Sequence, residues 1–169
     1  SKKQRVIDLR AGQAVFEVAA ESGRPFVVQT QQQQILANVA QFDVNAYQEG
    51  YLEVTVVEGE VTVLPATEAL AKQSNPEPHQ SYQIAASQML LIEAEADPLV
   101  FPVNAKRRTS WLQGKLYFEN EPLKNVLAQV NRHIETPINL ASPALGELLV
   151  SGKFEQGDLN RFTQRLSKQ

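Results

Sequence analysis

The chain has 169 residues, of which 43% are hydrophobic, which suffices for one large domain or two small ones with a buried core. No apolar run approaches the roughly 18 residues of a membrane helix, and the basic start lacks the apolar stretch of a signal peptide. The absence of cysteine excludes disulfides, thiolate metal sites and cysteine nucleophiles. Two alternatives stay open: a cytosolic protein, or a fragment whose targeting segment lies upstream.

The net charge of −3 is unevenly distributed along the chain. Residues 1–105 carry six Lys or Arg against thirteen Asp or Glu, whereas residues 106–169 carry ten against six. The change of sign coincides with a change from an all-β to a mixed pattern, and it predicts a domain boundary near Ala105. The basic residues of the second part are not interleaved with aromatic residues, so we expect no nucleic-acid binding.

The first half reads as a succession of short strands. Val6–Val18 predicts a pair of strands joined by a turn at Arg10–Gly12. Ser22–Pro25 is a turn signal, Phe26 begins another strand, and the glutamine-rich run Gln29–Gln34 is typical of a hairpin tip.

The next segment, Tyr51–Leu64, predicts a hairpin with its turn at Glu58-Gly59. The polar, proline-rich run Pro65–His79 predicts an exposed excursion between strands. Further strands are expected at residues 82–85, 89–93 and 99–103. This spacing favours an all-β sandwich, barrel or roll for the first domain, residues 1–105.

A linker is expected at Ala105–Ser110, followed by a small α/β domain at residues 106–169. Leu116 and Phe118 alternate with polar residues as in a half-buried strand. Asn120 is the expected N-cap of a helix, with Pro122 in its first turn and Pro137 closing it. The apolar stripe of this helix comprises Leu123, Val126, Leu127, Val130 and Ile134, and a strand at Ile138–Leu140 follows it.

Beyond a turn at Pro143 and Gly146, Leu148–Phe154 alternates as a strand, and Asp158 is the expected N-cap of a second helix. That helix would bury Leu159, Phe162 and Leu166. The order β-α-β-β-α normally continues into one more strand, which would follow residue 169. We therefore expect this module to lack its last strand and to leave a sheet edge uncovered.

No constellation of side chains points to catalysis. His79 and His133 are the two imidazoles, and neither has the neighbours of a metal or catalytic site. His133 is expected near a helix C-terminus, where a cation is favourable. Phosphate-binding and nucleophile-elbow motifs are absent. We expect no enzyme, no metal and no cofactor, and look to surfaces and strand edges for function.

Two series of residues resemble a known family. In the second half they are Trp111, Gly114, Leu116, Phe118, Pro122-Leu123, Val126, Asn131-Arg132, Pro137-Ile138, Val150-Ser151-Gly152, Phe154, Asp158 and Phe162. In the first half they are Val6–Phe16, Arg24–Val28, Phe42–Val44 and Val54–Val63. Together they resemble FecR-type regulators, in which a FecR domain precedes a module similar to the short N-terminal (STN) domain of secretins and TonB-dependent receptors. The chain departs from the family pattern at two glycines, where it has Val39 and Ser87.

The resemblance implies a two-domain fold, an all-β roll or sandwich followed by a βαβ-type STN-like module. It also implies the periplasmic part of a single-pass inner-membrane anti-sigma factor in cell-surface signalling. The expected partners are the signalling domain of a TonB-dependent outer-membrane siderophore transducer and, through a cytoplasmic segment upstream of this fragment, an extracytoplasmic-function sigma factor. Membrane attachment would run through an upstream helix, and the outcome would be regulation of transcription for iron transport.

A free strand edge in the second domain suggests partner binding by strand addition. The candidate residues are Leu148, Leu149, Val150, Ser151, Gly152, Lys153 and Phe154; the alternative is a central strand covered on both faces. Trp111 is the expected anchor at the join of the two domains. The rival interpretation of the whole chain is a structural envelope-assembly module of the secretin or STN type, which would form oligomers.

Overall fold

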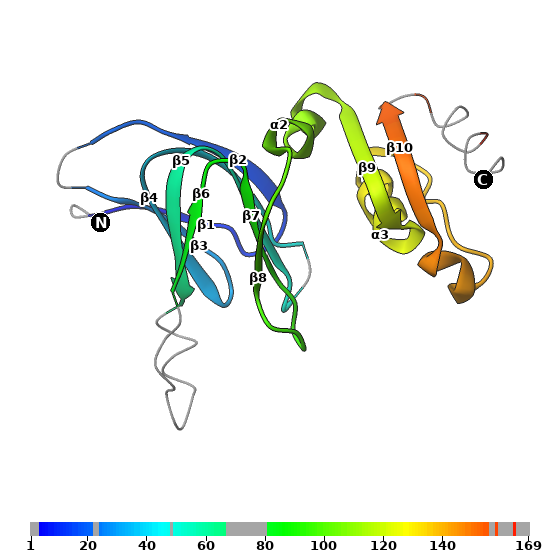
Figure 1. Cartoon of the computed structure of the whole chain (residues 1–169), viewed down its shortest axis with the longest axis horizontal. Helices are drawn as coiled ribbons and strands as arrows, with labels where there is room; N and C mark the ends of the chain where they lie inside the picture. Colours follow the sequence, from blue (N-terminus) through cyan, green and yellow to red (C-terminus); the bar gives the residue numbers. More distant parts are fainter. Residues whose placement is uncertain are drawn as a thin grey trace. The chain divides into compact units, whose positions relative to one another are not determined.

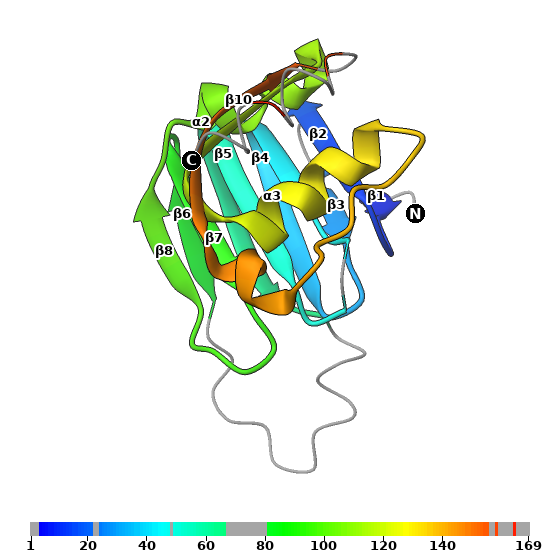
Figure 2. The same cartoon turned by 90° about the vertical axis from the view of Figure 1, so that its right-hand side faces the viewer.

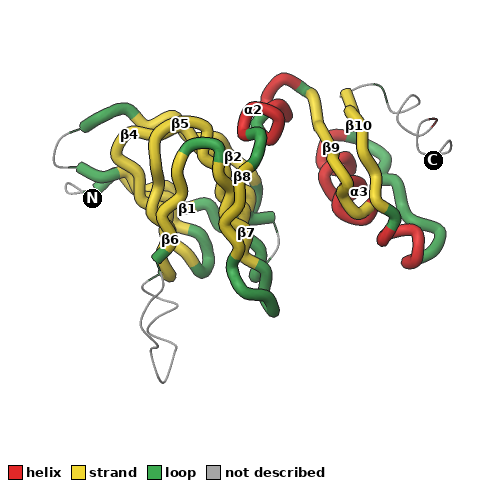
Figure 3. Tube along the Cα trace, viewed as in Figure 1, coloured by secondary structure: helices red, strands yellow, loops and turns green. Residues whose placement is uncertain are grey.

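The computed structural model describes residues 4–21, 24–47, 49–66, 81–155, 158 and 164. The chain divides into two compact units, residues 1–106 and 107–169, and each is described by itself. Strands dominate the first unit, whereas the second combines two strands with short helices (Figure 3).

The first unit contains an eight-stranded sheet whose centre is formed by two long neighbouring strands (Figures 1 and 2). Its strands are β1 (Arg5–Asp8), β2 (Gln13–Val18), β3 (Phe26–Gln29), β4 (Gln33–Asn45), β5 (Leu52–Pro65), β6 (Tyr82–Ala85), β7 (Gln88–Ile92) and β8 (Leu99–Pro102). Pairing divides the sheet into two halves that share β4 and β5. One half has the order β1-β3-β4-β5-β6 and the other β2-β4-β5-β7-β8.

The two halves contribute to one apolar core. Ile35 and Val63 come from one half, and Phe42, Val44 and Val54 from the other. Where the halves meet, the buried apolar residues of β4 change from odd to even numbers, and those of β5 change from even to odd. The β4–β5 register shifts there, between Ala37 and Ala40 and between Gln41 and Phe42. These bulges allow both halves of each strand to point apolar side chains into the same core.

The predicted hairpin at Tyr51–Leu64 is therefore wrong. Residues 52–65 form the single strand β5, and Glu58-Gly59 is part of its bulged region rather than a turn. Gly59 has φ +76°, and a Cβ placed there would lie 2.3 Å from the Val39 carbonyl oxygen. Glycine at this position permits both the left-handed backbone and the close approach of β4.

The predicted strand pair at Val6–Val18 is also wrong, although both strands form. β1 lies parallel to β3, while β2 lies antiparallel to β4. The segment around Arg10–Gly12 carries the chain from one half of the sheet to the other. Its residues have turn character, but the partners of the flanking strands lie further along the sequence.

Other predictions for this unit are confirmed. β3 and β4 form the hairpin around the glutamine-rich tip, where Thr30 N donates to Gln33 O at 2.9 Å. β6 and β7 flank a two-residue turn in which Ser87 adopts φ +63°. Residues 67–80, which hold most of the predicted excursion and His79, and Ser22-Gly23 lie outside the described residues.

The second unit packs one helix against a two-stranded antiparallel sheet (Figure 1). The expected linker is instead a short helix, α2 (Ala105–Arg108), and a 3-10 turn, η1 (Ser110–Gln113), follows it. The remaining elements are β9 (Lys115–Pro122), α3 (Leu123–Val130), η2 (Asn131–His133), η3 (Pro143–Glu147) and β10 (Leu149–Glu155). Among the described residues, no helix is long and apolar enough to cross a membrane.

The predicted apolar positions of this unit do form its core. The buried set is Leu116, Phe118, Leu123, Val126, Leu127, Val130, Val150 and Phe154. Trp111, Ile134, Ile138 and Leu140 are half-buried against it. Trp111 thus packs on the core of its own unit. Of the predicted second helix, the structure describes Asp158, whose N–H donates to Glu155 O, and Gln164, which is helical.

Asn120 does not cap the helix as predicted. β9 continues to Pro122, which precedes α3 directly, and no side chain caps the helix. Asn120 adopts φ +49° in a bulge of β9, where the register with β10 shifts. The Asn120 N–H donates to Ser151 Oγ at 2.8 Å, and that hydroxyl lies 3.2 Å from Asn120 Oδ1. The serine side chain therefore bridges the strands where the ladder is interrupted.

No strand forms at Ile138–Leu140, and the helix ends earlier than Pro137. α3 continues only as the 3-10 turn η2, which ends at His133. The Asn131 side chain instead holds both backbone groups of Ile138: Nδ2 donates to Ile138 O at 2.9 Å, and Ile138 N donates to Oδ1 at 2.8 Å. The amide thus substitutes for a strand neighbour, because it offers one donor and one acceptor side by side.

Replacing Asn131 with Ala should destabilise the second unit by about 1–3 kcal/mol, since two partly buried backbone groups lose their partners. Asn131→Asp is the matched variant, because it keeps the acceptor for the Ile138 N–H but loses the donor to its carbonyl. Urea unfolding followed by the emission of Trp111 measures both losses. Wild-type stability in both variants would contradict a structural role for this amide.

Candidate interaction surface

The described residues contain no group of three or more His, Cys, Asp or Glu side chains that could hold a metal ion. His133 lies at the end of η2, and burial, together with the neighbouring Arg132 charge, lowers its pKa. The protonated form is thus disfavoured there, contrary to the expectation that the helix end would favour a cation.

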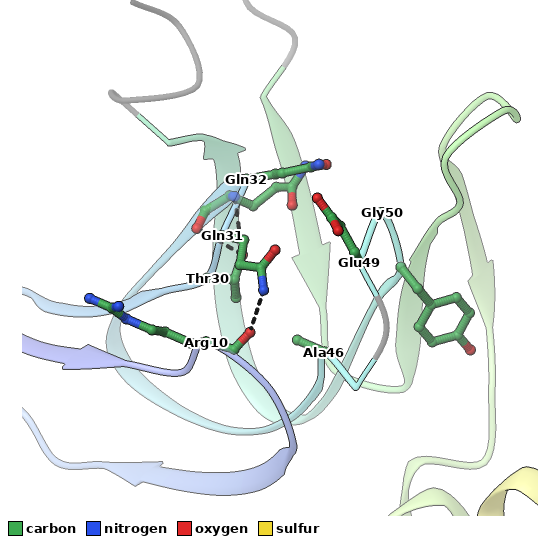
Figure 4. Close-up of a pocket in the computed structure, with 9 residues that line it drawn as sticks. Arg10, Thr30, Gln31, Gln32, Ala46, Glu49 and Gly50 are labelled. Carbon is green, nitrogen blue, oxygen red and sulfur yellow. Dashed lines mark hydrogen bonds between the residues drawn. The ribbon is translucent and has the colours of Figure 1, made fainter. Parts of the chain in front are cut away.

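A small hollow lies beside the glutamine-rich tip of the first unit (Figure 4). Its lining includes Arg10, Thr30, Gln31 and Tyr51, and Gln31 Nε2 donates to Arg10 O at 3.1 Å. Its volume is about 20 Å³, enough for a water molecule. An organic ligand needs a pocket more than tenfold larger, on the order of 300 Å³.

The residues predicted to bind a partner differ in burial. Val150 and Phe154 are buried in the core of the second unit, Lys153 is half-buried, and the exposed ones are Leu148, Leu149, Ser151 and Gly152. Within the described residues, β10 pairs on one side with β9, and no strand pairs with its other side.

The backbone of β10 alternates between its two sides. Leu148 O accepts the Leu123 N–H at 2.8 Å and so faces β9. Because successive residues of a strand point their N–H and C=O groups in opposite directions, those of Leu149, Ser151 and Lys153 face away from β9. We call this row of backbone groups the β10 edge.

The side chains of the same three residues lie on the solvent face of the two-stranded sheet, opposite Val150 and Phe154. Lys153 lies across from Tyr117 of β9, with its Nζ 5.7 Å from the ring centre. The Arg107 guanidinium lies 5.8 Å from that ring centre. Lys153 also forms an ion pair with Glu155, and this hydrogen bond raises the pKa of the lysine.

An apolar corner adjoins the start of the β10 edge. Leu145 is 41% exposed, Leu148 54% and Leu149 64%. We call these three residues the leucine corner. The Lys124–Glu147 ion pair, with 2.7 Å between Nζ and Oε1, connects α3 with the η3 turn, which contains Leu145. The Leu148 N–H donates to Leu145 O at 3.3 Å, so the turn brings the backbone of these two leucines together.

The edge strands of the first unit are shorter than β10. β1, β6 and β8 have four residues each, β8 also ends in Pro102, which has no N–H to donate, and β2 has six residues. β10 is seven residues long and contains no proline. The sequence analysis did not include Leu145 or Tyr117 in the candidate surface. The alternation of β9 assigned Tyr117 to the polar face of that strand, but no sequence pattern assigned Leu145, which precedes β10, to the surface.

Comparison with known proteins gives two findings. Residues 1–62 match the model of the family described as FecR protein. Over 98% of the chain, the fold is similar to two crystal structures of a "putative anti-sigma factor" from Parabacteroides distasonis ATCC 8503, with TM-scores of 0.82 and 0.81 at 24% identity, covering 73% of those chains. No curated protein matches the chain.

Proposed function

We propose that this chain is the periplasmic signal-receiving region of a FecR-type sigma-factor regulator. In this proposal it binds the N-terminal signalling domain of a TonB-dependent outer-membrane transducer. The observation that carries the proposal is the β10 edge, with which no strand of the described residues pairs, and the leucine corner beside it. An open strand edge is suited to receive an extended segment of a partner.

Two findings support this role. The FecR match covers the first 62 residues, and the fold over nearly the whole chain is that of an anti-sigma factor candidate. The finer elements of the proposal rest on the sequence resemblance: the STN-like identity of the second unit, the siderophore transducer, and the inner-membrane helix upstream. The second unit is the expected receiver because it carries the β10 edge.

Binding would proceed by strand addition. The N–H and C=O groups of Leu149, Ser151 and Lys153 would pair with an extended segment of the transducer. The leucine corner would be covered by apolar side chains of the same partner. Signal passage would then follow from the free energy of this docking, because a partner shifts a conformational equilibrium only by its differential affinity for the two states.

Replacing Leu149 with Pro tests the proposal, with Leu149→Ala as its matched control. Both variants remove the exposed side chain, but Pro also removes an N–H of the β10 edge. Leu148 has φ −63° and ψ 130°, a conformation that a following proline accepts. Because it loses one edge hydrogen bond, the Pro variant should bind about tenfold more weakly than the Ala variant. Calorimetry with a purified transducer signalling domain would measure both affinities.

Equal affinities of the Pro and Ala variants would rule out strand addition at this edge. The same samples test the rival role as an envelope-assembly module. If the edge pairs with a second copy, wild-type protein would sediment as an oligomer and Leu149→Pro as a monomer. A monomeric wild-type protein that binds the signalling domain favours the receiver.

A further inference from the structure

We infer that the β10 edge selects an antiparallel segment with an acidic residue followed, four positions later, by a bulky apolar residue. This inference rests on the proposed function, because it names the chemistry of the segment that docks there. The acidic residue would lie opposite Lys153 and the apolar residue opposite Leu149. Between these two residues, the two residues whose side chains face α3 would also be apolar.

The spacing follows from the backbone. Residues 149, 151 and 153 turn their backbone groups toward the position of an added strand, and their side chains lie on the solvent face of the sheet, which such a strand would extend. Directly opposite residues of an antiparallel pair carry their side chains on the same face, about 5 Å apart. An added strand running against β10 therefore meets Lys153 first, Ser151 two residues later and Leu149 after two more.

The charge at the first position follows from the surroundings of Lys153. On the β9 side the lysine faces the Tyr117 ring, and along its own strand it contacts Glu155. One ion pair does not exhaust the three donors of an ammonium group, and the Lys153 side chain keeps 33% of its surface exposed. A carboxylate opposite Lys153 on an added strand could form a further charge-assisted hydrogen bond, whereas a cation there is repelled.

The apolar positions follow from burial. Leu149 is 64% exposed beside Leu148, so an apolar residue opposite it removes apolar surface of both strands from water. The intervening residues of the added strand face the same side as Val150 and Phe154, which are buried against α3. Apolar residues there would extend the core of the second unit by one strand.

Synthetic peptides test this pattern on the full chain. The matched peptide is Thr-Glu-Val-Thr-Val-Leu-Thr, one control has Lys in place of Glu, and a second control has the reversed order. NMR titration of the isotope-labelled protein gives both the affinity and the amides that shift. We expect shifts at residues 149–155 and a two- to fivefold preference for Glu over Lys, in line with one cross-strand charge pair. In the Lys153→Glu variant this preference should reverse.

A preference that survives Lys153→Glu, shifts confined to other strands, or tighter binding of the reversed peptide would each overturn the inference. The result is separable from the proposed function. If the transducer domain fails to bind while the peptides obey the pattern, the proposed function fails alone. If the domain binds in a manner sensitive to Leu149→Pro but the peptides show no charge preference, the inferred pattern fails alone.

Discussion

Gly59→Ala should destabilise the first unit by about 2–5 kcal/mol. The φ of +76° costs an L-residue about 1–2 kcal/mol, and the added methyl would lie 2.3 Å from the Val39 carbonyl oxygen. That oxygen belongs to the β4 backbone, so relief requires displacement of a strand, which adds about 1–3 kcal/mol. Because β4 and β5 join both halves of the sheet, the loss should appear in the unfolding of the whole unit. Urea denaturation followed by far-UV circular dichroism measures it.

Gly12→Ala separates the two causes of this loss. Gly12 has φ +121°, but a Cβ there would meet no atom within 4 Å. This variant carries backbone strain without a collision, and its φ lies further from the left-handed region of L-residues than that of Gly59, so its loss is an upper bound on the strain at Gly59. A loss in Gly59→Ala that exceeds the loss in Gly12→Ala is therefore due to the collision with β4. Wild-type stability of Gly59→Ala would mean that β4 moves aside at negligible cost, and that the bulge does not constrain the sheet.

The bulge also shows where sequence patterns mislead. Glu58-Gly59, between two runs of alternating valines, is the pattern of a hairpin turn, and the alternation changes phase there as a turn would require. A bulge produces the same phase change without reversing the chain. The distinguishing fact is that β4 carries a matching shift at Val39, and pairing between distant segments is not visible in local alternation.

Local sequence patterns predicted the structure better where the contacting segments are near each other in the sequence. The stripe from Leu123 to Val130 predicted a helix and its buried face, and the glutamine-rich tip predicted the β3–β4 hairpin. The strand expected at Ile138–Leu140 failed for a physical reason. Its residues are apolar and do pack on the core, but the Asn131 amide satisfies the Ile138 backbone groups that a neighbouring strand would otherwise pair.

The candidate surface was predictable in part. Alternation at Leu148–Phe154 identified the strand and its two faces, and an unpaired edge was expected from the order of elements. Which residues of the strand offer their backbone to a partner could not be predicted. That depends on the Leu123–Leu148 hydrogen bond, which sets the direction of every later N–H along β10.

Phe154→Ala should unfold or nearly unfold the second unit. Phe154 is 1% exposed and belongs to a core that holds eight buried residues among those described. Removing a buried phenyl ring costs about 3–5 kcal/mol, comparable to the whole stability of a unit of this size, about 3–9 kcal/mol. Trp111, the one tryptophan of the chain, is half-buried against this core, so its emission should shift to longer wavelength. The β-sheet signal of the first unit in circular dichroism should persist.

Leu149→Ala is the control for this experiment, because it removes an exposed side chain from the same strand. Its Trp111 emission and urea midpoint should match those of the wild type, while partner binding weakens if the leucine corner is a docking surface. Phe154→Ala should lose binding together with its fold. A Phe154→Ala variant with native emission and a native midpoint would show that the core tolerates the cavity. Loss of binding in Leu149→Ala with native emission would separate docking from stability, because both side chains belong to β10 and only one of them is buried.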